Sequence, residues 1–237
     1  FVRTADNLVD CVPQKNKEFK EYVKLTWQAW DGSLSGHQEI DLFIDQCKRL
    51  GFDKKWVKSF LDAMEMDLLK NRYQTLDETL TYMYGSAEVI GLMMAKILEL
   101  SEKSYQSAAM LGRAMQYANF IRDFVEDINM NRLYFPFNDL CVTEIDIKNL
   151  DQITQRQDFS KFLRCQINKF EEWQNEAEKG FVYIPKRYLI PIKTASDMYK
   201  WTVKEIKKNP LIVVKTKVKP SLIRILWTII KNTIMIK

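Results

Sequence analysis

The stretch MQYANFIRDFVED, from Met115 to Asp127, decides the fold of this chain. No glycine or proline interrupts it, and apolar residues recur all round a period of 3.6 residues, which predicts a buried helix. Four polar residues, Gln116, Asn119, Asp123 and Asp127, are spaced by three or four positions and therefore share one helix face. An unpaired ionised carboxylate in a dry core would cost on the order of 5 kcal/mol or more. The polar face is therefore expected to line a wet cavity, meet cations or hold a metal.

A second pair of acidic residues has the spacing of Asp123 and Asp127, which lie one turn apart. This pair is Asp6 and Asp10, and Arg3 stands one turn before it. Two carboxylates one turn apart can reach the same hard cation, because such cations prefer oxygen ligands. Two such pairs, each with an arginine nearby, predict facing walls of a polyanion site, where metal ions and arginines bind phosphate. A solvated charged face is the simpler alternative for either pair alone.

A third pair with this spacing, Asp41 and Asp45, lies in the helix expected at residues 38–50. It lacks an arginine one turn earlier, has no amide residues on its face and lies near Glu39. We therefore expect this pair to belong to an exposed helix face.

Four blocks of sequence resemble, in this order, those of the squalene/phytoene synthase family, the head-to-head prenyl synthases. They are FVRTADNLVD (1–10), FLDAMEMDLLKNRY (60–73), YMYGSAEVIGLMM (82–94) and LGRAMQYANFIRDFVEDINMNRLYFP (111–136). The likeness is greatest to phytoene synthase and continues more weakly to about residue 220. Because the family usually carries a further helical segment before the first block, we expect an N-terminal segment to be missing from this chain, which begins at Phe1.

The resemblance implies an all-α fold: a single-domain isoprenoid-synthase-type helical bundle around a central cavity, spanning residues 1–237. It implies Mg²⁺, with Mn²⁺ as an alternative, held by Asp6, Asp10, Asp123 and Asp127. Diphosphate would be bound by Arg3, Arg122 and Arg132 and oriented by Gln116 and Asn119. Among the tyrosines, Tyr82 would face the active cavity as a catalytic residue, and Tyr73 and Tyr199 would lie near the diphosphate.

The reaction implied by the resemblance joins two identical prenyl diphosphates through a cyclopropyl intermediate. We expect C20 substrates and phytoene, with C15 substrates giving squalene or dehydrosqualene as the alternative. The carbocation needs aromatic faces in a water-poor pocket, for which Tyr82, Tyr117, Phe120 and Phe124 are candidates. A terpene cyclase is disfavoured because no D-D-x-x-D motif is present. A non-catalytic helical assembly protein, or a helical module that binds membrane or nucleic acid, remains as a rival from another class.

The composition agrees with a helical intracellular protein. Glycine (7) and proline (6) are scarce among 237 residues, which favours helices. The one histidine, His37, excludes multi-histidine metal sites and is expected at a surface helix start. No G-x-G-x-x-G or P-loop occurs, so NADPH is not expected.

The cysteines, Cys11, Cys47, Cys141 and Cys165, show no C-x-x-C spacing and are expected to be reduced. With no signal peptide recognised, a cytoplasmic location is expected, either free or peripheral on the inner membrane face.

The C-terminal part, residues 201–237, is both basic and apolar, with nine basic residues and one acidic residue. It is too charged to span a bilayer, which needs about 20 apolar residues. A basic, Trp-containing amphipathic helix suits an anionic membrane surface; a last core helix with a lysine-rich rim is the alternative. We expect the helix to pack on the core and its lysines to meet a peripheral membrane surface. Nucleic acid is not expected, because the remainder of the chain is acidic. Monomer and dimer stay open.

Helical periodicity and capping patterns predict the other elements. Helices are expected at 1–12, 15–30, 38–50, 54–72, 75–100, 105–129, 151–179 and 194–208, with a loop and short helix at 141–150 and a loop at 131–136.

Overall fold

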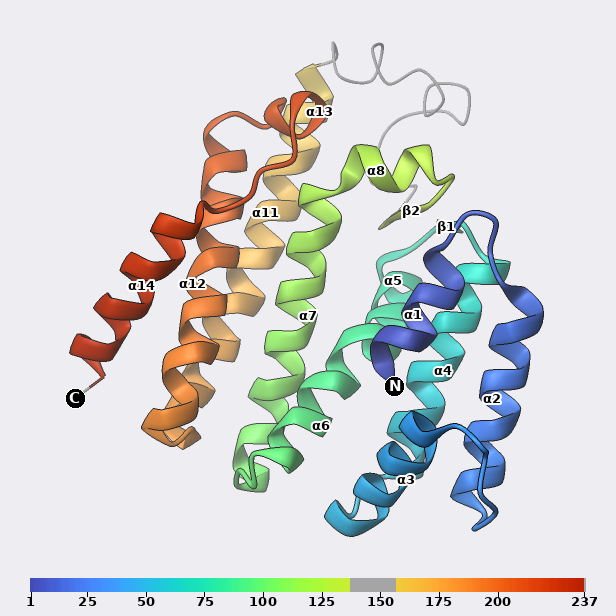
Figure 1. Cartoon of the computed structure of the whole chain (residues 1–237). Helices are drawn as coiled ribbons and strands as arrows, with labels where there is room; N and C mark the ends of the chain where they lie inside the picture. The colour runs from blue at the N-terminus through green and yellow to red at the C-terminus, as the bar shows by residue number, and fades with distance from the viewer. Residues whose placement is uncertain (137–156, 237) are drawn as a thin grey trace.

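The computed structural model of the protein describes residues 1–136 and 157–236, so Cys141 and the element expected at 141–150 lie outside the described residues. The all-α prediction is confirmed (Figure 1). The α-helices are α1 (Val2–Asp10), α2 (Asn16–Trp30), α3 (Gln38–Leu50), α4 (Lys54–Leu69), α5 (Leu76–Met83), α6 (Val89–Ile97), α7 (Tyr105–Arg122), α8 (Phe124–Asn129), α11 (Gln157–Glu178), α12 (Lys186–Lys208), α13 (Ile212–Lys215) and α14 (Leu222–Met235).

Short elements connect these helices. A π-helical turn, η1 (Tyr84–Glu88), joins α5 to α6, and the 3₁₀ turns η2 (Glu102–Ser104) and η4 (Lys179–Tyr183) precede α7 and α12. The strands β1 (Arg72–Tyr73) and β2 (Leu133–Pro136) pair in parallel. Two predicted helix starts are explained by side-chain caps: Asp53 accepts from the Lys55 amide at 2.8 Å, and Thr75 accepts from the Glu78 amide at 3.3 Å.

Helix α7 is the centre of the molecule. It packs against α6 and η1 on one side and against α11 and α12 on the other (Figure 1). The approach of α6 and α7 depends on glycines. A Cβ on Gly91 would lie 2.2 Å from the Ala108 carbonyl oxygen, and one on Gly112 would lie 2.3 Å from the Ala87 carbonyl oxygen. The two backbones are therefore in direct contact, which no larger residue would permit.

The helix expected over 105–129 does not run unbroken. Helix α7 ends at Arg122. The next residue, Asp123, has φ −98° and ψ 14° and separates α7 from α8. The hydrogen bond from the Asp127 amide to the Asp123 carbonyl, 2.9 Å, still preserves one turn across the break. The two carboxylates therefore keep nearly the placement that a continuous helix would give them.

Three further boundaries differ from the sequence prediction. The helix expected to end at Arg72 ends at Leu69, because Arg72 and Tyr73 pair with β2, where a loop was expected. The helix expected over 75–100 contains η1, where a Cβ on Gly85 would lie 2.1 Å from the Ser59 carbonyl oxygen. Helix α12 begins at Lys186, eight residues before the expected start at 194, and contains Pro191 in its interior.

The last helix, α14, is packed on one side only. Its Asn232 is fully buried and donates to Thr194 Oγ1 at 3.2 Å and to Asp197 Oδ2 at 3.0 Å, both on α12. Eight large apolar side chains of α14 are exposed, from 38% for Ile229 to 79% for Leu222. The expectation of a last core helix is therefore wrong for most of its surface. Within residues 1–136 and 157–236, no helix combines the length and apolar character needed to cross a bilayer.

Candidate active site

The predicted metal-binding carboxylates all line one cavity of about 360 Å³, here called the polar cavity. Asp6 and Asp10 reach it from α1, whereas Asp123 and Asp127 reach it from the junction of α7 and α8. Gln116, Asn119, Arg122 and Arg132 line the same cavity. Two carboxylates that the sequence reasoning did not select, Asp67 and Glu126, line it as well. Residues more than one hundred positions apart in sequence therefore meet around one space.

The crowding of carboxylates changes their pKa values. Burial, followed by the neighbouring charge of Asp123, raises the pKa of Asp127 to about 8. Burial and then Asp10 raise the pKa of Asp6. Burial raises the pKa of Asp67 to about 6, although Arg132 opposes the shift. The cavity therefore disfavours negative charge unless cations enter it.

Arginines already neutralise part of this charge. Arg132, directly before β2, is buried; its Nη1 donates to Asp10 Oδ1 at 2.5 Å and its Nη2 to the Val9 carbonyl at 2.8 Å, which ties the start of β2 to α1. Arg122 holds Asp123 with two hydrogen bonds, of 2.8 and 2.5 Å. Although burial alone would raise it, hydrogen bonds from Arg122 and Lys217 hold the pKa of Asp123 below its usual value.

Lys217 is a further member of the site. It follows α13, and its Nζ lies 2.9 Å from Asp123 Oδ1 and also pairs with Glu126. In the sequence it stood only among the basic residues of the tail. Its position in the sequence gives no sign of a contact with Asp123, because the two residues are far apart in sequence and meet only in the folded protein.

The donor atoms that line the polar cavity decide whether it could hold a metal ion. Among the described residues, no group of three or more His, Cys, Asp or Glu side chains is arranged closely enough to hold an ion without rearrangement. The polar cavity nevertheless offers carboxylate and amide oxygens, the donors that Mg²⁺ and Mn²⁺ prefer. Six carboxylates line it against Arg122 and Arg132, with Lys217 at Asp123. The donor chemistry and the excess of negative charge therefore fit divalent cations.

A second cavity of about 420 Å³, here called the apolar cavity, lies along α6, η4 and α12 on α7. Ile90, Met94, Leu111 and Phe181 are among its apolar lining residues. Gln116 and Asn119 line this cavity too, so the polar and apolar cavities adjoin at these two amides. Tyr199 also lines the apolar cavity, beside rather than within the carboxylate cluster.

The amides at the junction are not fully satisfied. Asn119 donates to Gln116 Oε1 at 3.3 Å, but its own buried Oδ1 has no hydrogen-bond partner among the described residues. The buried Ser86 Oγ, in the apolar cavity, is likewise without a partner there. Because buried polar groups are normally hydrogen-bonded, these atoms indicate where a polar ligand would be accommodated.

Some predicted site residues lie elsewhere. Arg3 is exposed on α1 and is not among the residues that line the polar cavity, although its charge partly opposes the rise that burial causes in the pKa of Asp6. Tyr73 is buried behind the cavity, with its ring centroid 5.5 Å from that of Tyr82 and 5.8 Å from that of Tyr134. Its hydroxyl finds no hydrogen-bond partner in the part of the chain that the structure describes.

The aromatic residues divide into two groups. Tyr82 and Phe120 line the polar cavity, together with Tyr134, which the sequence reasoning did not select. Tyr117 and Phe124 do not line it: the Tyr117 hydroxyl donates to Gln166 Oε1, and the Phe124 ring packs near Phe159. The expectation for these last two rings is therefore wrong.

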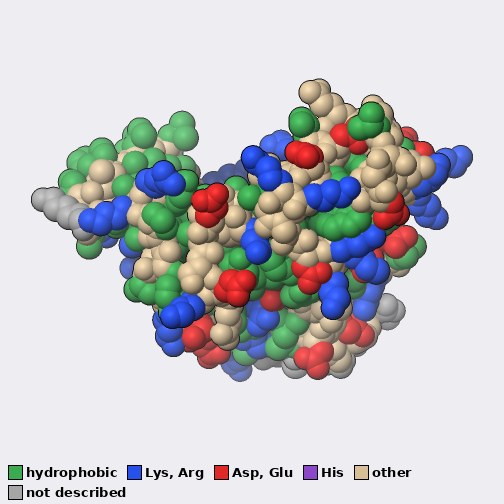
Figure 2. All heavy atoms as spheres, turned by 90° about the horizontal axis from the view of Figure 1, so that it is seen from below, with side chains coloured by type: hydrophobic (Ala, Val, Ile, Leu, Met, Phe, Trp, Pro, Cys, Tyr) green, Lys and Arg blue, Asp and Glu red, His purple; other side chains and the backbone are tan. Residues whose placement is uncertain are grey.

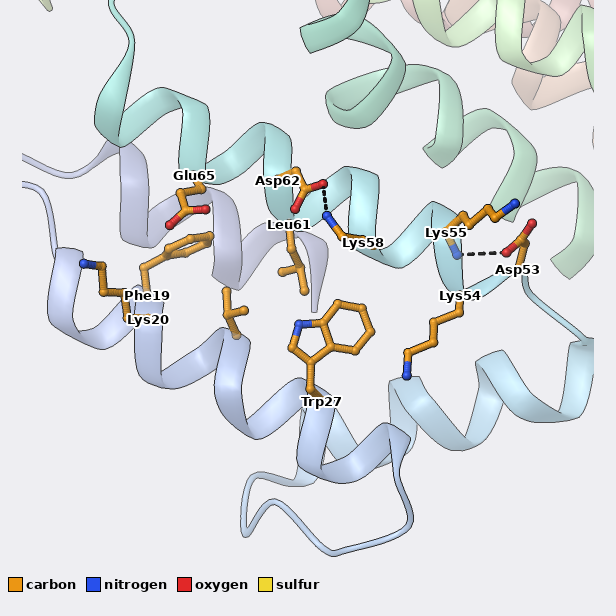
Figure 3. A pocket seen from close by; sticks show the side chains of 11 residues that line it. Phe19, Lys20, Trp27, Asp53, Lys54, Lys55, Lys58, Leu61, Asp62 and Glu65 are labelled. Atoms are coloured by element: carbon orange, nitrogen blue, oxygen red, sulfur yellow. Dashed lines mark hydrogen bonds and ion pairs between the residues drawn. The ribbon is translucent and has the colours of Figure 1, made fainter.

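A larger cavity of about 620 Å³ lies between α2 and α4 (Figure 3). Its apolar floor includes Phe19, Trp27 and Leu61, and its charged groups include Asp62, which pairs with Lys58 at 2.6 Å. None of the predicted site residues lines it. Asp41 and Asp45 line neither this cavity nor the polar one, which agrees with their expected place on an outer face.

The sequence was compared with known proteins. It is 32% identical over 184 residues to the 15-cis-phytoene synthase of Enterobacter agglomerans, covering 77% of this chain and 60% of that protein. It is 31% identical over 220 residues to the chloroplastic phytoene synthase of Daucus carota, covering 88% of this chain and 55% of that protein. The chain therefore spans little more than half the length of these relatives.

Solved structures share the fold. A dehydrosqualene synthase in complex with ligand matches with a TM-score of 0.85 at 18% identity, covering 99% of this chain and 83% of that one. The squalene synthase HpnC of Alicyclobacillus acidocaldarius matches with a TM-score of 0.76 at 17% identity, covering 87% and 79%. The sequence model of the squalene/phytoene synthase family matches residues 1–224. The chain, with its carboxylate-lined cavity beside an apolar one, belongs to the squalene/phytoene synthase family.

Proposed function

We propose that the protein condenses two prenyl diphosphates head to head, using C20 substrates to give phytoene. The observation that carries this proposal is the pair of adjoining cavities that share Gln116 and Asn119. One is lined by charged groups suited to diphosphate and its cations, and the other is apolar and suits a prenyl chain. Membership of the family and the phytoene synthases among its relatives support the same reaction.

The charged residues divide the work at the diphosphates. Asp6, Asp10, Asp123 and Asp127 would hold the metal ions, and Mg²⁺, when bound, neutralises the charge that develops on a leaving diphosphate. Arg122, Arg132 and Lys217 present cationic groups at the same cavity and would bind phosphate oxygens directly. Gln116 and Asn119 would orient the diphosphate at the boundary with the prenyl chain. Arg3, Tyr73 and Tyr199 remain proposed substrate-binding residues at the margins of the site.

The carbocation requires protection after the first diphosphate leaves. Rings of Tyr82, Phe120 and Tyr134 line the polar cavity and offer electron-rich faces to a cation. The first condensation releases diphosphate and a proton and closes a cyclopropane ring. The second ionisation releases the other diphosphate, and loss of a further proton gives phytoene or, from C15 substrates, dehydrosqualene. Squalene would require a hydride from NADPH, for which the sequence holds no recognised motif.

Incubation with C15 or C20 diphosphates, with and without NADPH, followed by product analysis, tests this proposal. We expect diphosphate release that depends on Mg²⁺ and is lost in Asp123→Asn and Asp6→Asn. Asp45→Asn is the matched control, because Asp45 has the same one-turn spacing from a second aspartate but lies outside the polar cavity. Full activity of the unchanged protein in EDTA would falsify the metal-dependent mechanism. No turnover of either substrate would favour a non-catalytic helical protein.

We also propose peripheral contact with an anionic membrane surface, made by α14. Five of its exposed residues follow the spacing of one helix face, opposite the side that packs on α12: Ile223, Leu226, Trp227, Ile230 and Ile234. Figure 2 shows hydrophobic side chains gathered at this end of the molecule, with Lys and Arg beside them. Lys231 on α14 and Lys219, two residues before its N-cap Ser221, are exposed as well. An apolar face with basic neighbours matches the surface of an anionic bilayer, where such a helix lies flat. We further propose that the protein is cytoplasmic and makes this contact at the inner membrane face.

Flotation with vesicles tests the membrane contact. Vesicles that contain phosphatidylglycerol should carry the protein, and vesicles of phosphatidylcholine alone should carry less. Replacing Trp227 and Ile230 by serine removes apolar area and should weaken binding at least about 10-fold. The control replaces Leu42 and Leu69, which are also exposed but lie on α3 and at the end of α4. Equal flotation of both double variants, or a dimer formed through α14 that ignores vesicles, would contradict the proposal.

A further inference from the structure

A buried carboxylate of the polar cavity takes no part in the roles proposed above. Asp67, on α4, is 7% exposed. Its Oδ2 accepts a hydrogen bond from the Tyr82 hydroxyl, and its Oδ1 accepts one from the Tyr134 hydroxyl, each at 2.8 Å. Both carboxylate oxygens are therefore engaged by phenols, which distinguishes Asp67 from the four aspartates proposed to hold metal.

The two phenols are also fixed at their rings. The Tyr82 and Tyr134 centroids lie 5.0 Å apart at an interplanar angle of 29°, and Tyr134 stacks on Phe120 at 4.4 Å and 7°. All three rings line the polar cavity. Ring stacking and the Asp67 hydrogen bonds together leave each phenol one orientation, so this wall of the cavity is preorganised.

The direction of these hydrogen bonds has a chemical consequence. Because both phenolic protons point to Asp67, a cation approaching either oxygen meets lone pairs rather than a positive hydrogen. Donation to a carboxylate also shifts electron density towards the phenol oxygen and its ring. Oriented, electron-rich groups stabilise developing positive charge without having to reorganise during the reaction.

We infer that Asp67 is a positioning residue that acts through Tyr82 and Tyr134 to stabilise the carbocation formed after diphosphate leaves. This inference rests on the proposed function and adds to it a residue whose two carboxylate oxygens both accept hydrogen bonds from phenols. The alternative is that the three residues only tie together α4, α5 and β2, the elements that carry them. The alternative predicts an effect on stability without a specific effect on turnover.

Asp67→Asn tests the inference, because the amide keeps the shape of the carboxylate but has only one acceptor oxygen. One phenol must then lose its acceptor. We expect kcat for diphosphate release to fall about 10- to 100-fold, the range for loss of a supporting partner, while KM changes less than about 2-fold. If the variant does not fold, Tyr134→Phe, which retains the carboxylate, is measured instead. It should also lower kcat while changing KM little.

Thr79→Val is the matched control. The Thr79 hydroxyl donates to the Tyr134 carbonyl at 2.8 Å and so joins α5 to β2 at the same place, yet Thr79 does not line the polar cavity. This variant should lower Tm and leave kcat within about 2-fold. A purely structural role for Asp67 predicts instead that kcat falls in proportion to Tm in both variants.

A double-mutant cycle completes the experiment. In a Tyr82→Phe/Tyr134→Phe background, Asp67→Asn should lower kcat no further, because the groups through which Asp67 acts are gone. An undiminished effect in that background overturns the inference, as does an unchanged kcat in Asp67→Asn alone. If the unchanged protein releases no diphosphate, the proposed function fails first and this inference with it, whereas an active protein that tolerates Asp67→Asn refutes the inference alone.

Discussion

The polar and apolar cavities lie on the same helix but are built by different means. The polar cavity gathers charged side chains from α1, α4, α8 and the turn before β2 around the end of α7, and ion pairs such as Arg132–Asp10 hold its walls. The apolar cavity is lined mainly by α6, α7 and α12, and glycines bring the backbones of α6 and η1 into contact with α7 along it. Electrostatic balance shapes one side and close backbone packing shapes the other. The two sides should therefore fail in different ways when they are altered.

Gly112→Val should give the largest effect, on the apolar side. Any Cβ at this position meets the Ala87 carbonyl oxygen at 2.3 Å, so α7 must move away from η1. We expect the free energy of unfolding to fall by about 3 kcal/mol or more, measured by urea titration. Gly51→Asn is the control, because a Cβ on Gly51 meets nothing within 4 Å and its left-handed φ of +65° tolerates asparagine. Equal losses in both variants would contradict the packing argument.

Arg132→Gln should have the next largest effect, on the polar side. Removal of the guanidinium leaves Asp10 without its partner and the Val9 carbonyl with only the hydrogen bond from the Gln14 side-chain amide. Because Asp10 is partly exposed, we expect a loss of about 2 kcal/mol, less than for a fully buried pair. Hydrogen exchange of residues 1–10 should accelerate, since α1 loses its tie to β2. Lys58→Gln breaks an exposed pair with Asp62 and should cost no more than about 0.5 kcal/mol.

Leu111→Phe should change substrate choice more than stability. The larger ring occupies volume in the apolar cavity that a prenyl chain would otherwise fill. We expect the ratio of kcat/KM for C20 over C15 diphosphate to fall about 10-fold, the scale of discrimination by size in apolar pockets. Leu42→Phe, on the exposed face of α3, should leave the ratio unchanged. A ratio that moves equally in both variants would show that Leu111 does not limit chain length.

Lys217→Met should have the smallest effect. The ammonium of Lys217 pairs with Asp123 and Glu126 and so occupies carboxylate oxygens that a divalent cation would need. Its removal should tighten binding of Mg²⁺ alone by roughly 2- to 5-fold, the equivalent of about 0.4–1 kcal/mol for such a pair. Calorimetric titration measures this directly. Lys215→Met, two residues earlier and exposed, is the control. Weaker binding in Lys217→Met would mean that the lysine supports the metal site instead.

Local spacing predicted much of this site. Gln116, Asn119, Asp123 and Asp127 line the polar cavity because positions three and four apart share a helix face, even though α7 breaks at Asp123. The same helical spacing places Tyr117 and Phe124, seven positions apart, on a face directed away from the two amides. These rings could therefore have been excluded from the cavity lining on spacing alone. Asp67 could also have been noticed, because it follows Phe60, Ala63 and Met64 on the buried face of α4.

Other features lay beyond local spacing. Lys217 reaches Asp123 from 94 positions away, and Tyr134 reaches Asp67 from 67 positions away, so only the fold brings them together. The pairing of β1 with β2 and the π-helical turn η1 depend on tertiary packing, which overrides local helical preference. Arg3 and Tyr73 belong to the right blocks of sequence, but their side-chain directions are set by packing around α1 and β1.

The amide pair Gln116 and Asn119 borders both cavities, and a molecule that occupies both must pass it. A substitution of either amide would change both how a hydrocarbon chain fits the apolar cavity and how a charged group is positioned in the polar cavity. Substrate length and reaction rate are thus linked at two side chains, and neither property can be retuned there in isolation.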